Sequence, residues 1–435
     1  MIVCKFGGSS LADAVQIQKV KEIVDADSRR AIVIVSAPGK RTSADEKVTD
    51  MLYGCARLVR EGRSCEPLFA KVADRYTSIL SGLGMNGDFL LPILSEVRAS
   101  IDAGAGAHWA ASRGEHLCAR LVAEYFGWQF LETEGRIIIA DDGSVDEQSY
   151  TLLSASLEPG TRYVVPGFYG SNGQGMVQTF SRGGSDITGA ILARASGAEV
   201  YENWTDVSGV FSVDPRLVDG AKVIGEMTYR EVRELAGVGA GVFHEEAIAP
   251  LLPVAIPINV KNTNAPLDKG TWIVESRECG DNPLSGVAAK GGYSRLTIRK
   301  LMLLKSTGIR HALMTMMRVF GVRPSFSLFG IDSIVWFFET SQASEGVLEA
   351  MCARLKEEFA LESIEVDGGY AILGVVGAGV NSDPSLIGSV SCALQSEKIP
   401  IHFLNYGSSD TSLLIGVAEE SAKEATIALY RALFA

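Results

Sequence analysis

The chain has 435 residues, of which 47% are hydrophobic, so it can bury large cores and divide into two or three domains. Its formal net charge of -12 excludes a protein that coats nucleic acid or anionic membranes, although a local cationic pocket could still bind a small anion. Seven scattered cysteines without a CxxC pair favour a reduced, cytoplasmic location, and five widely spaced histidines argue against a histidine-rich metal site. The opening residues, MIVCKFGG, are typical of a strand rather than of a signal peptide, and no apolar run is long enough to span a membrane.

From residue 1 to about 275, strand-like and helix-like segments alternate, which predicts an α/β fold with buried parallel strands. We expect a helix-rich stretch from about 43 to 126, and strands at 1–6, 31–37, 136–140, 162–168, 198–204, 256–262 and 270–274. Residues 276–293 are rich in Gly, Pro and Ser and are typical of a domain connection. Two compact strand–helix–strand units follow and form a weak internal repeat.

The first candidate site is the sequence KFGGSS, which begins at Lys5. A strand ends at this lysine, two glycines let the backbone bend closely, and a serine opens a helix. Backbone N–H groups exposed at such a bend favour an anion, and Lys5 adds a mobile positive charge suited to phosphate. A helix cap beside a surface lysine explains the same residues equally well. The loop is not a Walker A motif, because GxxxxGK[ST] is absent from the chain.

The second candidate is FSRGGSDITGA, in which two adjacent glycines predict a turn rather than a helix or strand interior. Arg182 offers a planar fork for a carboxylate, and the glycines that follow it let a substrate approach the backbone. Ser185 can cap the next helix, while Asp186 could pair with a substrate ammonium group or orient Lys5. A plain glycine turn with an Asp/Ser cap is the alternative.

Two weaker candidates complete the set. A strand ends at WTDVSGV, where Thr205 and Asp206 could meet ribose, adenine or a metal-bound phosphate, and Arg216 beyond it could reach a phosphate. Within a helical SRGE sequence, Glu115 could bind a substrate ammonium group, although a lone glutamate on a helix is usually solvated.

Taken together and in this order, the motifs resemble those of the aspartokinases, in the amino-acid kinase superfamily. The matching segments are KFGGSS at 5–10, Ser36-Ala37, Thr49-Asp50, SRGE at 112–115, PGFYG at 166–170, SRGGSD at 181–186 and WTDVSGV through DPR at 204–216. Two segments near the end, VVGAGVNSDP and NYGSSDTSLLIGV, are similar to the family's tail of two ACT domains. The resemblance covers essentially the whole chain.

The resemblance implies an amino-acid-kinase three-layer sandwich with a mainly parallel central sheet, followed by two ferredoxin-like α+β ACT domains. The catalytic domain would span 1–275 and the linker 276–293, part of which could add a strand to the second ACT unit. The two ACT domains would occupy 294–369 and 370–435.

The implied reaction is ATP-dependent phosphorylation of the L-aspartate β-carboxylate to 4-phospho-L-aspartate, the first step toward lysine, threonine and methionine. Carried over residue by residue, Lys5 would stabilise the transferring phosphoryl group and Asp186 would order the charged centre. The remaining implied contacts are ATP with Lys5, Gly7, Gly8, Ser9, Thr205, Asp206 and Arg216, and aspartate with Thr49, Glu115, Arg182, Gly184 and Ser185.

The resemblance also implies ligands and partners. Mg²⁺ would be carried by the nucleotide, without a metal site of the protein's own. Lysine or threonine would act as effector at an ACT interface in a homodimer or homotetramer. Neither nucleic acid nor a membrane is an expected partner, and the location would be cytoplasmic.

Three departures from the family pattern stand out. A family lysine that contacts the nucleotide phosphates is missing at Gly241, and Lys261 is the nearest candidate to replace its charge. Gly330-Ile331 stands where a Thr-Ser pair often occurs, and Asp50 stands where the family has Asn. Rival hypotheses are a kinase of glutamate or acetylglutamate, and an amino-acid sensor that has lost activity.

Overall fold

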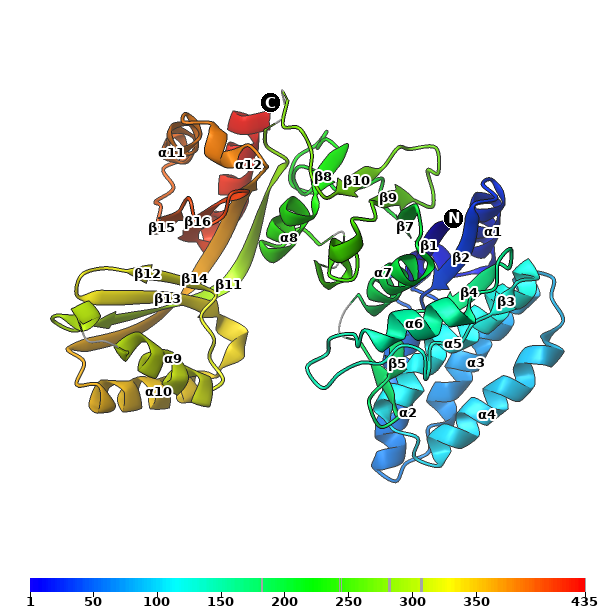
Figure 1. Cartoon of the computed structure of the whole chain (residues 1–435). Helices are drawn as coiled ribbons and strands as arrows, with labels where there is room; N and C mark the ends of the chain where they lie inside the picture. Colours follow the sequence, from blue (N-terminus) through cyan, green and yellow to red (C-terminus); the bar gives the residue numbers. More distant parts are fainter. Residues whose placement is uncertain (181–182, 242, 244, 281–282, 306–307, 435) are drawn as a thin grey trace. The chain divides into compact units, whose positions relative to one another are not determined.

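A computed structural model of the chain describes all residues except 181–182, 242, 244, 281–282, 306–307 and 435 (Figure 1). The chain forms two compact units by its internal contacts. The first comprises Met1–Phe211, Lys222–Ala236 and Gly241–Glu278, and the second Ser212–Ala221, Gly237–Ala240 and Cys279–Ala435.

Within the described residues, an eight-stranded sheet forms the centre of the first unit. Its strands in spatial order are β3 (Gln129–Phe130), β4 (Tyr163–Pro166), β2 (Arg30–Val35), β1 (Ile2–Phe6), β7 (Val200–Thr205), β9 (Ile258–Asn262), β10 (Thr271–Val274) and β8 (Glu226–Thr228). Every neighbouring pair is parallel except β9 with β10. The mainly parallel central sheet predicted from the sequence is therefore confirmed. A separate antiparallel pair is formed by β5 (Tyr169–Ser171) and β6 (Val177–Thr179).

Helices cover the sheet on both faces, which gives the three layers. Side chains alternate along β1, so that Cys4 and Phe6 join a buried apolar cluster with the helices of one face. Those helices are α1 (Ala14–Asp25), α2 (Val48–Arg60), α3 (Glu66–Gly82), α4 (Leu90–Asp102) and α5 (Ala107–Phe126). Lys5 points to the other face, where α7 (Gly184–Ser196) packs on β1 and β7. The first unit also contains α6 (Gln148–Ser156), which packs on α7, and α8 (Tyr229–Gly237).

The strand expected at 136–140 does not form a regular strand. Only isolated bridges occur there, from Ile138 to Ser171 and from Ile139 to Val145. The N–H of Ile138 donates to Oγ of Ser149 at 2.8 Å, so a side chain has taken the place of a ladder partner. An apolar run such as RIIIA does not indicate that a serine hydroxyl will compete with a neighbouring strand for a backbone N–H group.

The second unit contains a six-stranded antiparallel sheet. Its strands in spatial order are β12 (Phe326–Phe329), β13 (Ser333–Glu339), β11 (Gly286–Arg299), β14 (Ser363–Val376), β16 (Ser412–Ala418) and β15 (Phe403–Asn405). The helices α9 (Ile309–Val319) and α10 (Glu345–Glu358) pack in one apolar cluster, and α11 (Leu386–Ser396) and α12 (Ala422–Phe434) in another. Residues 286–290 of β11 pair with 372–376 of β14. This α+β arrangement is the one expected for the second part of the chain.

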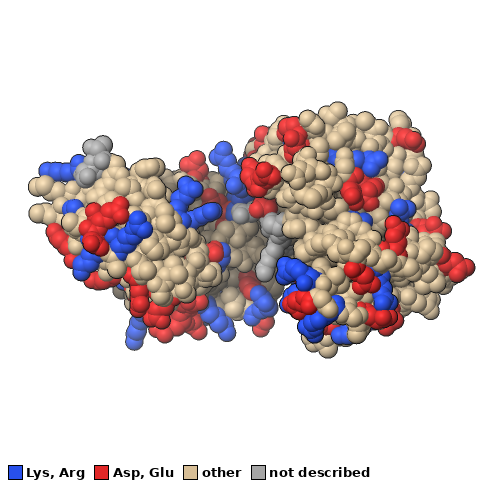
Figure 2. All heavy atoms as spheres, turned by 90° about the horizontal axis from the view of Figure 1, so that it is seen from below, with Lys and Arg blue, Asp and Glu red and all other residues tan. Residues whose placement is uncertain are grey.

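Short 3₁₀ helices connect several elements: η1 (Gly8–Leu11), η2 (Gly87–Phe89), η3 (Glu245–Ile248), η4 (Leu252–Val254), η5 (Leu303–Lys305), η6 (Thr340–Gln342), η7 (Val380–Ser382) and η8 (Glu419–Ser421). Acidic and basic side chains are interspersed among uncharged ones on the face shown in Figure 2. Among the described helices, none combines the length and the apolar character needed to cross a membrane.

A buried ion pair ties the end of the first unit to α8. The guanidinium of Arg277 donates to both carboxylate oxygens of Glu231, at 2.6 and 2.9 Å. The Arg277 side chain is 6% exposed and that of Glu231 is 0% exposed. The same carboxylate accepts the N–H of Thr228 at 2.7 Å, so it is held from several sides.

We predict that Arg277→Met destabilises the first unit by about 3–5 kcal/mol, because it leaves a buried carboxylate without its cation. The measurement is the midpoint of urea unfolding, followed by circular dichroism. Arg98→Met is the matched control, since Arg98 pairs with Glu66 at an exposed site. Equal shifts in the two variants would contradict the prediction.

Candidate active site

The candidate residues gather at one edge of the first unit's sheet. The strands β1, β2, β4 and β7 are parallel neighbours, so their carboxyl ends meet at this edge. The segments that follow them begin at Gly7, Ser36, Gly167 and Asp206. Crevices at the carboxyl ends of parallel strands are the usual ligand sites of open α/β sheets.

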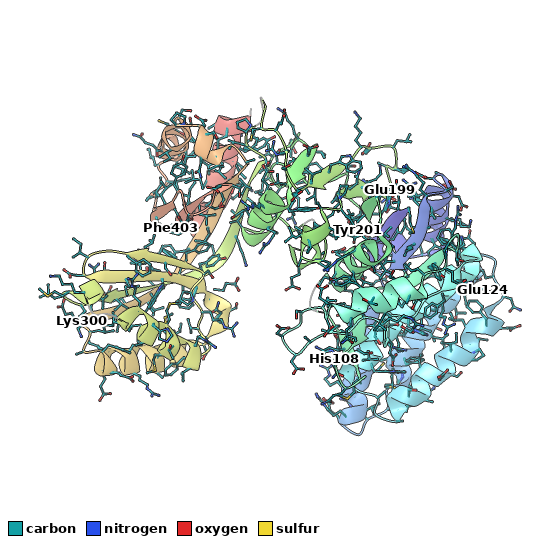
Figure 3. All side chains as sticks on the ribbon, in the orientation of Figure 1. His108, Glu124, Glu199, Tyr201, Lys300 and Phe403 are labelled. Atoms are coloured by element: carbon teal, nitrogen blue, oxygen red, sulfur yellow. The ribbon has the colours of Figure 1, made fainter. Side chains whose placement is uncertain are left out.

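A buried charged centre joins β1 to α7. Nζ of Lys5 lies 2.6 Å from Oδ1 of Asp186, and the Lys5 side chain is only 10% exposed. Asn203, the neighbour of Lys5 in the β1–β7 register, donates its amide to the same Asp186 oxygen at 3.0 Å. Tyr201, labelled in Figure 3, donates its hydroxyl to the backbone carbonyl of Asp186 at 3.1 Å. Lys5 is thus a fixed, desolvated cation rather than a surface lysine.

The glycine loop after β1 is held by backbone contacts. The N–H of Gly7 donates to the carbonyl of Trp204 at 3.0 Å, and the carbonyl of Gly8 accepts the N–H of Gly39 at 2.8 Å. Nζ of Lys5 lies 3.7 Å from the place where a Cβ on Gly7 would stand, so the ammonium lies directly beside the loop. Among the described residues, no partner is recorded for the N–H groups of Gly8 and Ser9. The loop therefore offers two N–H donors and a cation together, which suits a phosphate group.

Glu115 on α5 is fully buried beside this loop. One of its carboxylate oxygens, Oε2, has no hydrogen-bond partner in the described part of the chain. Burial raises the pKa of Glu115 to about 8, and a hydrogen bond from the backbone of Ala37 opposes that rise. The carbonyl of Ala37 lies 3.0 Å from where a Cβ on Gly8 would stand, so Glu115, Ala37 and Gly8 form a continuous contact. A buried carboxylate with an open oxygen is a ready acceptor for a cationic group.

The turn at the start of α7 closes tightly on the loop after β4. A Cβ on Gly184 would lie 2.8 Å from the Phe168 ring, and one on Gly167 would lie 2.6 Å from Oγ of Ser185. Phe168 has a φ of 80°, an unusual backbone conformation for a bulky residue. Its N–H donates to Oγ1 of Thr188 at 3.1 Å, which fixes that conformation.

Arg182 and Thr49 are the two residues predicted to bind the carboxylates of the substrate. Arg182 lies outside the described residues. Thr49 stands in the first turn of α2 and is half-buried.

On the nucleotide side, Thr205 ends β7 and donates its hydroxyl to Oδ1 of Asp206 at 3.2 Å. Lys261 is the β9 neighbour of Trp204, with Nζ 5.2 Å from the indole ring. Arg216 belongs to the second unit, where it pairs with Asp214, and its place relative to β7 is not described.

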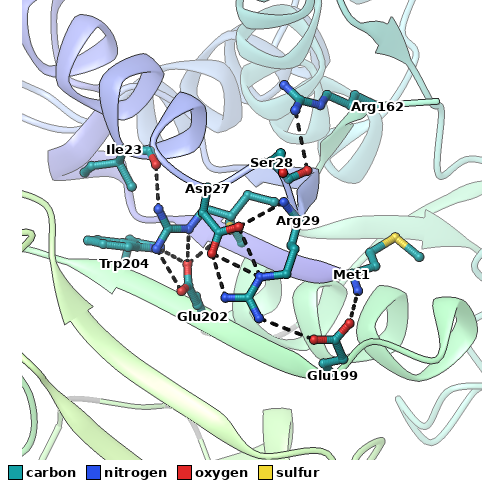
Figure 4. A network of polar contacts seen from close by, with 11 residues as sticks. Met1, Ile23, Asp27, Ser28, Arg29, Arg162, Glu199, Glu202 and Trp204 are labelled. Carbon is teal, nitrogen blue, oxygen red and sulfur yellow. Dashed lines mark hydrogen bonds and ion pairs between the residues drawn. The ribbon is translucent and has the colours of Figure 1, made fainter. Parts of the chain in front are cut away.

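A polar network that the sequence analysis missed holds the end of β7. Glu202 accepts the indole N–H of Trp204 at 2.9 Å and pairs with Nε of Arg30 at 2.8 Å (Figure 4). The Trp204 ring stacks on Phe6 with centroids 5.9 Å apart. The end of β7 is therefore fixed against β1, where the glycine loop begins. The only sequence signal of this network was the alternation of Glu202 and Trp204 next to Thr205.

Comparisons with known proteins identify the family of the chain. Residues 1–262 match the profile of the Amino acid kinase family, and residues 373–433 match that of the ACT domain. Aspartokinase 3 of Bacillus subtilis is 33% identical over 100% of this chain and 99% of its own length. The crystal structure of Clostridium acetobutylicum aspartate kinase is 37% identical, with a TM-score of 0.91 over 100% of both chains.

The fold alone is also shared with E. coli aspartokinase III, solved in complex with aspartate and ADP. That structure is 23% identical, with a TM-score of 0.83 over 100% of both chains. The full-length identity to Aspartokinase 3 and the match to the kinase profile together settle the family. The chain belongs to the aspartokinase family of amino acid kinases.

Proposed function

We propose that this chain transfers the γ-phosphoryl group of ATP to the β-carboxylate of L-aspartate, giving 4-phospho-L-aspartate and ADP. The observation that carries the proposal is the buried Lys5–Asp186 pair, 2.6 Å apart. It lies beside a glycine loop in which the N–H groups of Gly8 and Ser9 have no partner among the described residues. Phosphoryl transfer depends on positioning and on neutralising charge, and it needs no covalent intermediate with the enzyme. The residues at this edge of the sheet supply both.

On the phosphate side, Lys5 would neutralise charge on the transferred group while the N–H groups of Gly8 and Ser9 hold its oxygens. Gly7, whose own N–H donates to the carbonyl of Trp204, would contribute the close approach of the loop to Nζ of Lys5. Asp186 keeps the Lys5 ammonium in place and is itself held by Asn203. A weakly hydrated ammonium on a fixed stem acts without having to reorganise during the reaction.

We expect magnesium to arrive with the nucleotide. Mg²⁺ is usually bound by substrate phosphates together with few carboxylates, and it neutralises phosphate charge when bound. No group of three or more His, Cys, Asp or Glu residues that could hold a metal occurs among the described residues.

On the acceptor side, Glu115 would take the ammonium group of aspartate, and Arg182 and Thr49 its carboxylates. Gly184 and Ser185 would let the substrate lie against the start of α7, where the packing leaves no room for a larger side chain at Gly184. Thr205, Asp206 and Arg216 would hold ATP. Oε2 of Glu115, which has no hydrogen-bond partner among the residues that the structure describes, supports the first of these roles.

We propose a catalytic domain at 1–275, a linker at 276–293, and ACT domains at 294–369 and 370–435. The pairing of 286–290 with 372–376 supports a strand donated by the linker to the second ACT domain. Lysine or threonine would bind where ACT domains pair, which requires at least a homodimer, with a homotetramer as the larger alternative.

The test is hydroxylamine trapping with ATP and Mg²⁺, comparing L-aspartate with L-glutamate and N-acetylglutamate. We expect hydroxamate from aspartate alone, and a lower rate when lysine or threonine is added. Lys5→Met should abolish the product, whereas Lys19→Met, at a half-buried lysine of the same unit that donates to Asn264, should not. Product from another acid would identify a different amino-acid kinase. ATP binding without any product would leave the sensor hypothesis.

Glu115 gives a pH dependence. Because its pKa is about 8, the carboxyl is mostly protonated at pH 6 and must ionise to bind an ammonium group. We expect kcat/KM for aspartate to rise about tenfold per pH unit up to roughly pH 8 and then to level off.

Glu115→Gln should lower kcat/KM for aspartate and remove this rise, because an amide does not titrate. The matched control is kcat/KM for ATP at saturating aspartate, in which the Glu115 step should be absent. The same pH profile in the variant and the wild-type chain would contradict the assignment.

Lys261 is proposed to replace the family lysine missing at Gly241. Its Nζ donates to the carbonyl of Asp268 at 3.0 Å, and burial lowers its pKa. We expect Lys261→Ala to raise KM for ATP several-fold and to leave KM for aspartate unchanged, while Lys19→Ala changes neither. Unchanged turnover of ATP in Lys261→Ala would dispose of the hypothesis.

A further inference from the structure

A buried arginine lies behind the glycine loop on a helix that carries none of the predicted site residues. Arg75 is on α3, and its side chain is 5% exposed. Its Nη1 donates to the carbonyl of Gly39 at 2.7 Å, and its Nη2 lies 2.9 Å from Oδ2 of Asp45. Burying a guanidinium is costly unless its N–H donors form hydrogen bonds. The two acceptors, the Gly39 carbonyl and the Asp45 carboxylate, therefore fix the position of the Arg75 side chain.

Gly39 connects Arg75 to the glycine loop. The N–H of Gly39 donates to the carbonyl of Gly8 at 2.8 Å. A Cβ on Gly39 would lie 2.5 Å from the carbonyl carbon of Gly8 and 2.8 Å from the nitrogen of Ser9. Only a glycine fits in such a contact. The peptide of Gly39 is therefore fixed by Arg75 on one side and lies against the Gly8–Ser9 peptide on the other.

Asp45 completes the support. It accepts the backbone N–H of Arg41 at 2.9 Å and the Nε of Arg41 at 2.9 Å, in addition to its pair with Arg75. The segment from Gly39 to Asp45 is thus closed into a loop with Arg75 at its centre. A cavity of about 410 Å³ lies beside Arg75 and is lined by Arg41, Asp45 and other residues, among them Lys71 and Asp74.

We propose that Arg75 is a positioning residue for the phosphate-binding loop: by holding the Gly39 carbonyl, it sets the place of the Gly8–Ser9 peptide and hence of its N–H donors. The inference rests on the proposed function, because it assigns these donors to the nucleotide phosphates. Arg75 itself touches neither substrate. Its effect should therefore appear in the handling of ATP and not in that of aspartate.

The test compares Arg75→Ala with the wild-type chain. We expect kcat/KM for ATP to fall by about 10²-fold, because a displacement of about 1 Å in the site can have that effect. KM for aspartate should stay unchanged, and calorimetry should show a weaker Kd for ADP. A purely structural role for Arg75 would lower the unfolding temperature without separating ATP from aspartate.

Two matched controls isolate the contact with Gly39. Arg41→Ala removes another cation from Asp45 but no hydrogen bond to Gly39. Tyr76→Phe removes a buried hydrogen bond from the next residue of α3, which reaches the carbonyl of Gly114 at 2.6 Å. Neither control should change kcat/KM for ATP by more than about threefold, the usual scatter for a modest contact. An equal loss in Tyr76→Phe and Arg75→Ala would overturn the proposal.

A rescue experiment covers the case in which Arg75→Ala folds poorly. Arg75→Lys keeps the charge and a donor, so its kcat/KM for ATP should be at least tenfold higher than that of Arg75→Ala. Millimolar guanidinium should restore ATP turnover in Arg75→Ala through the adjoining cavity, whereas the same concentration of NaCl should not. Failure of both Arg75→Lys and guanidinium to restore ATP turnover would overturn the proposal.

The ADP measurement separates this inference from the proposed function. If the wild-type chain binds ADP but forms no hydroxamate, the reaction assigned above is wrong, and a weaker Kd in Arg75→Ala still supports the positioning role. If Arg75→Ala binds ADP as tightly as the wild-type chain does, the positioning role is wrong, whatever the wild-type activity.

Discussion

The first unit depends on keeping one lysine charged where water is largely excluded. Lys5 is 8% exposed, and a cation there is tolerated because Asp186 and Asn203 bind it. This arrangement requires the alternation of β1, which sends Phe6 to the helices of one face and Lys5 to α7 on the other. A register slip of one residue would exchange the two faces and place the ammonium in an apolar core. The charged centre therefore forms only when the strand register and the packing of α7 are both correct.

A second constraint is the space available around this centre. Gly39 lies against the Gly8–Ser9 peptide and Gly184 lies against Phe168, with no room for a Cβ at either position. The backbone around the site is thus closely packed at these glycines, which larger residues cannot replace. Arg75 holds the peptide of Gly39, whereas Glu202 holds the side chains of Trp204 and Arg30 at the end of β7.

Whether a site residue could be predicted from the sequence depended on how far apart the interacting residues lie along the chain. Lys5 and Asp186 were found because each stands in a glycine motif whose chemistry is local. Asn203, Glu202 and Arg75 were missed because each has a partner that is distant along the chain. The separations are 198 residues for Lys5 and Asn203, 172 for Arg30 and Glu202, and 36 for Gly39 and Arg75. The parallel sheet and the two α+β units followed from apolar periodicity, which reports burial. The irregular segment at 136–140 did not follow from it, since the hydroxyl of Ser149 took a backbone donor that periodicity assigns to a strand.

The second unit shows how two repeats can share one framework. The strands β11 and β14 each run for 14 residues and pair with each other along most of their length. Their register shifts twice, between Lys290 and Tyr293, beside Gly292, and between Tyr293 and Arg295, opposite Gly369. Both glycines have positive φ. A glycine bulge bends long strands and increases their twist without breaking the ladder. The halves on either side of the bulge are thus joined by paired backbone rather than by a flexible linker. A ligand that changed the twist of one half would act directly on the strands that form the other.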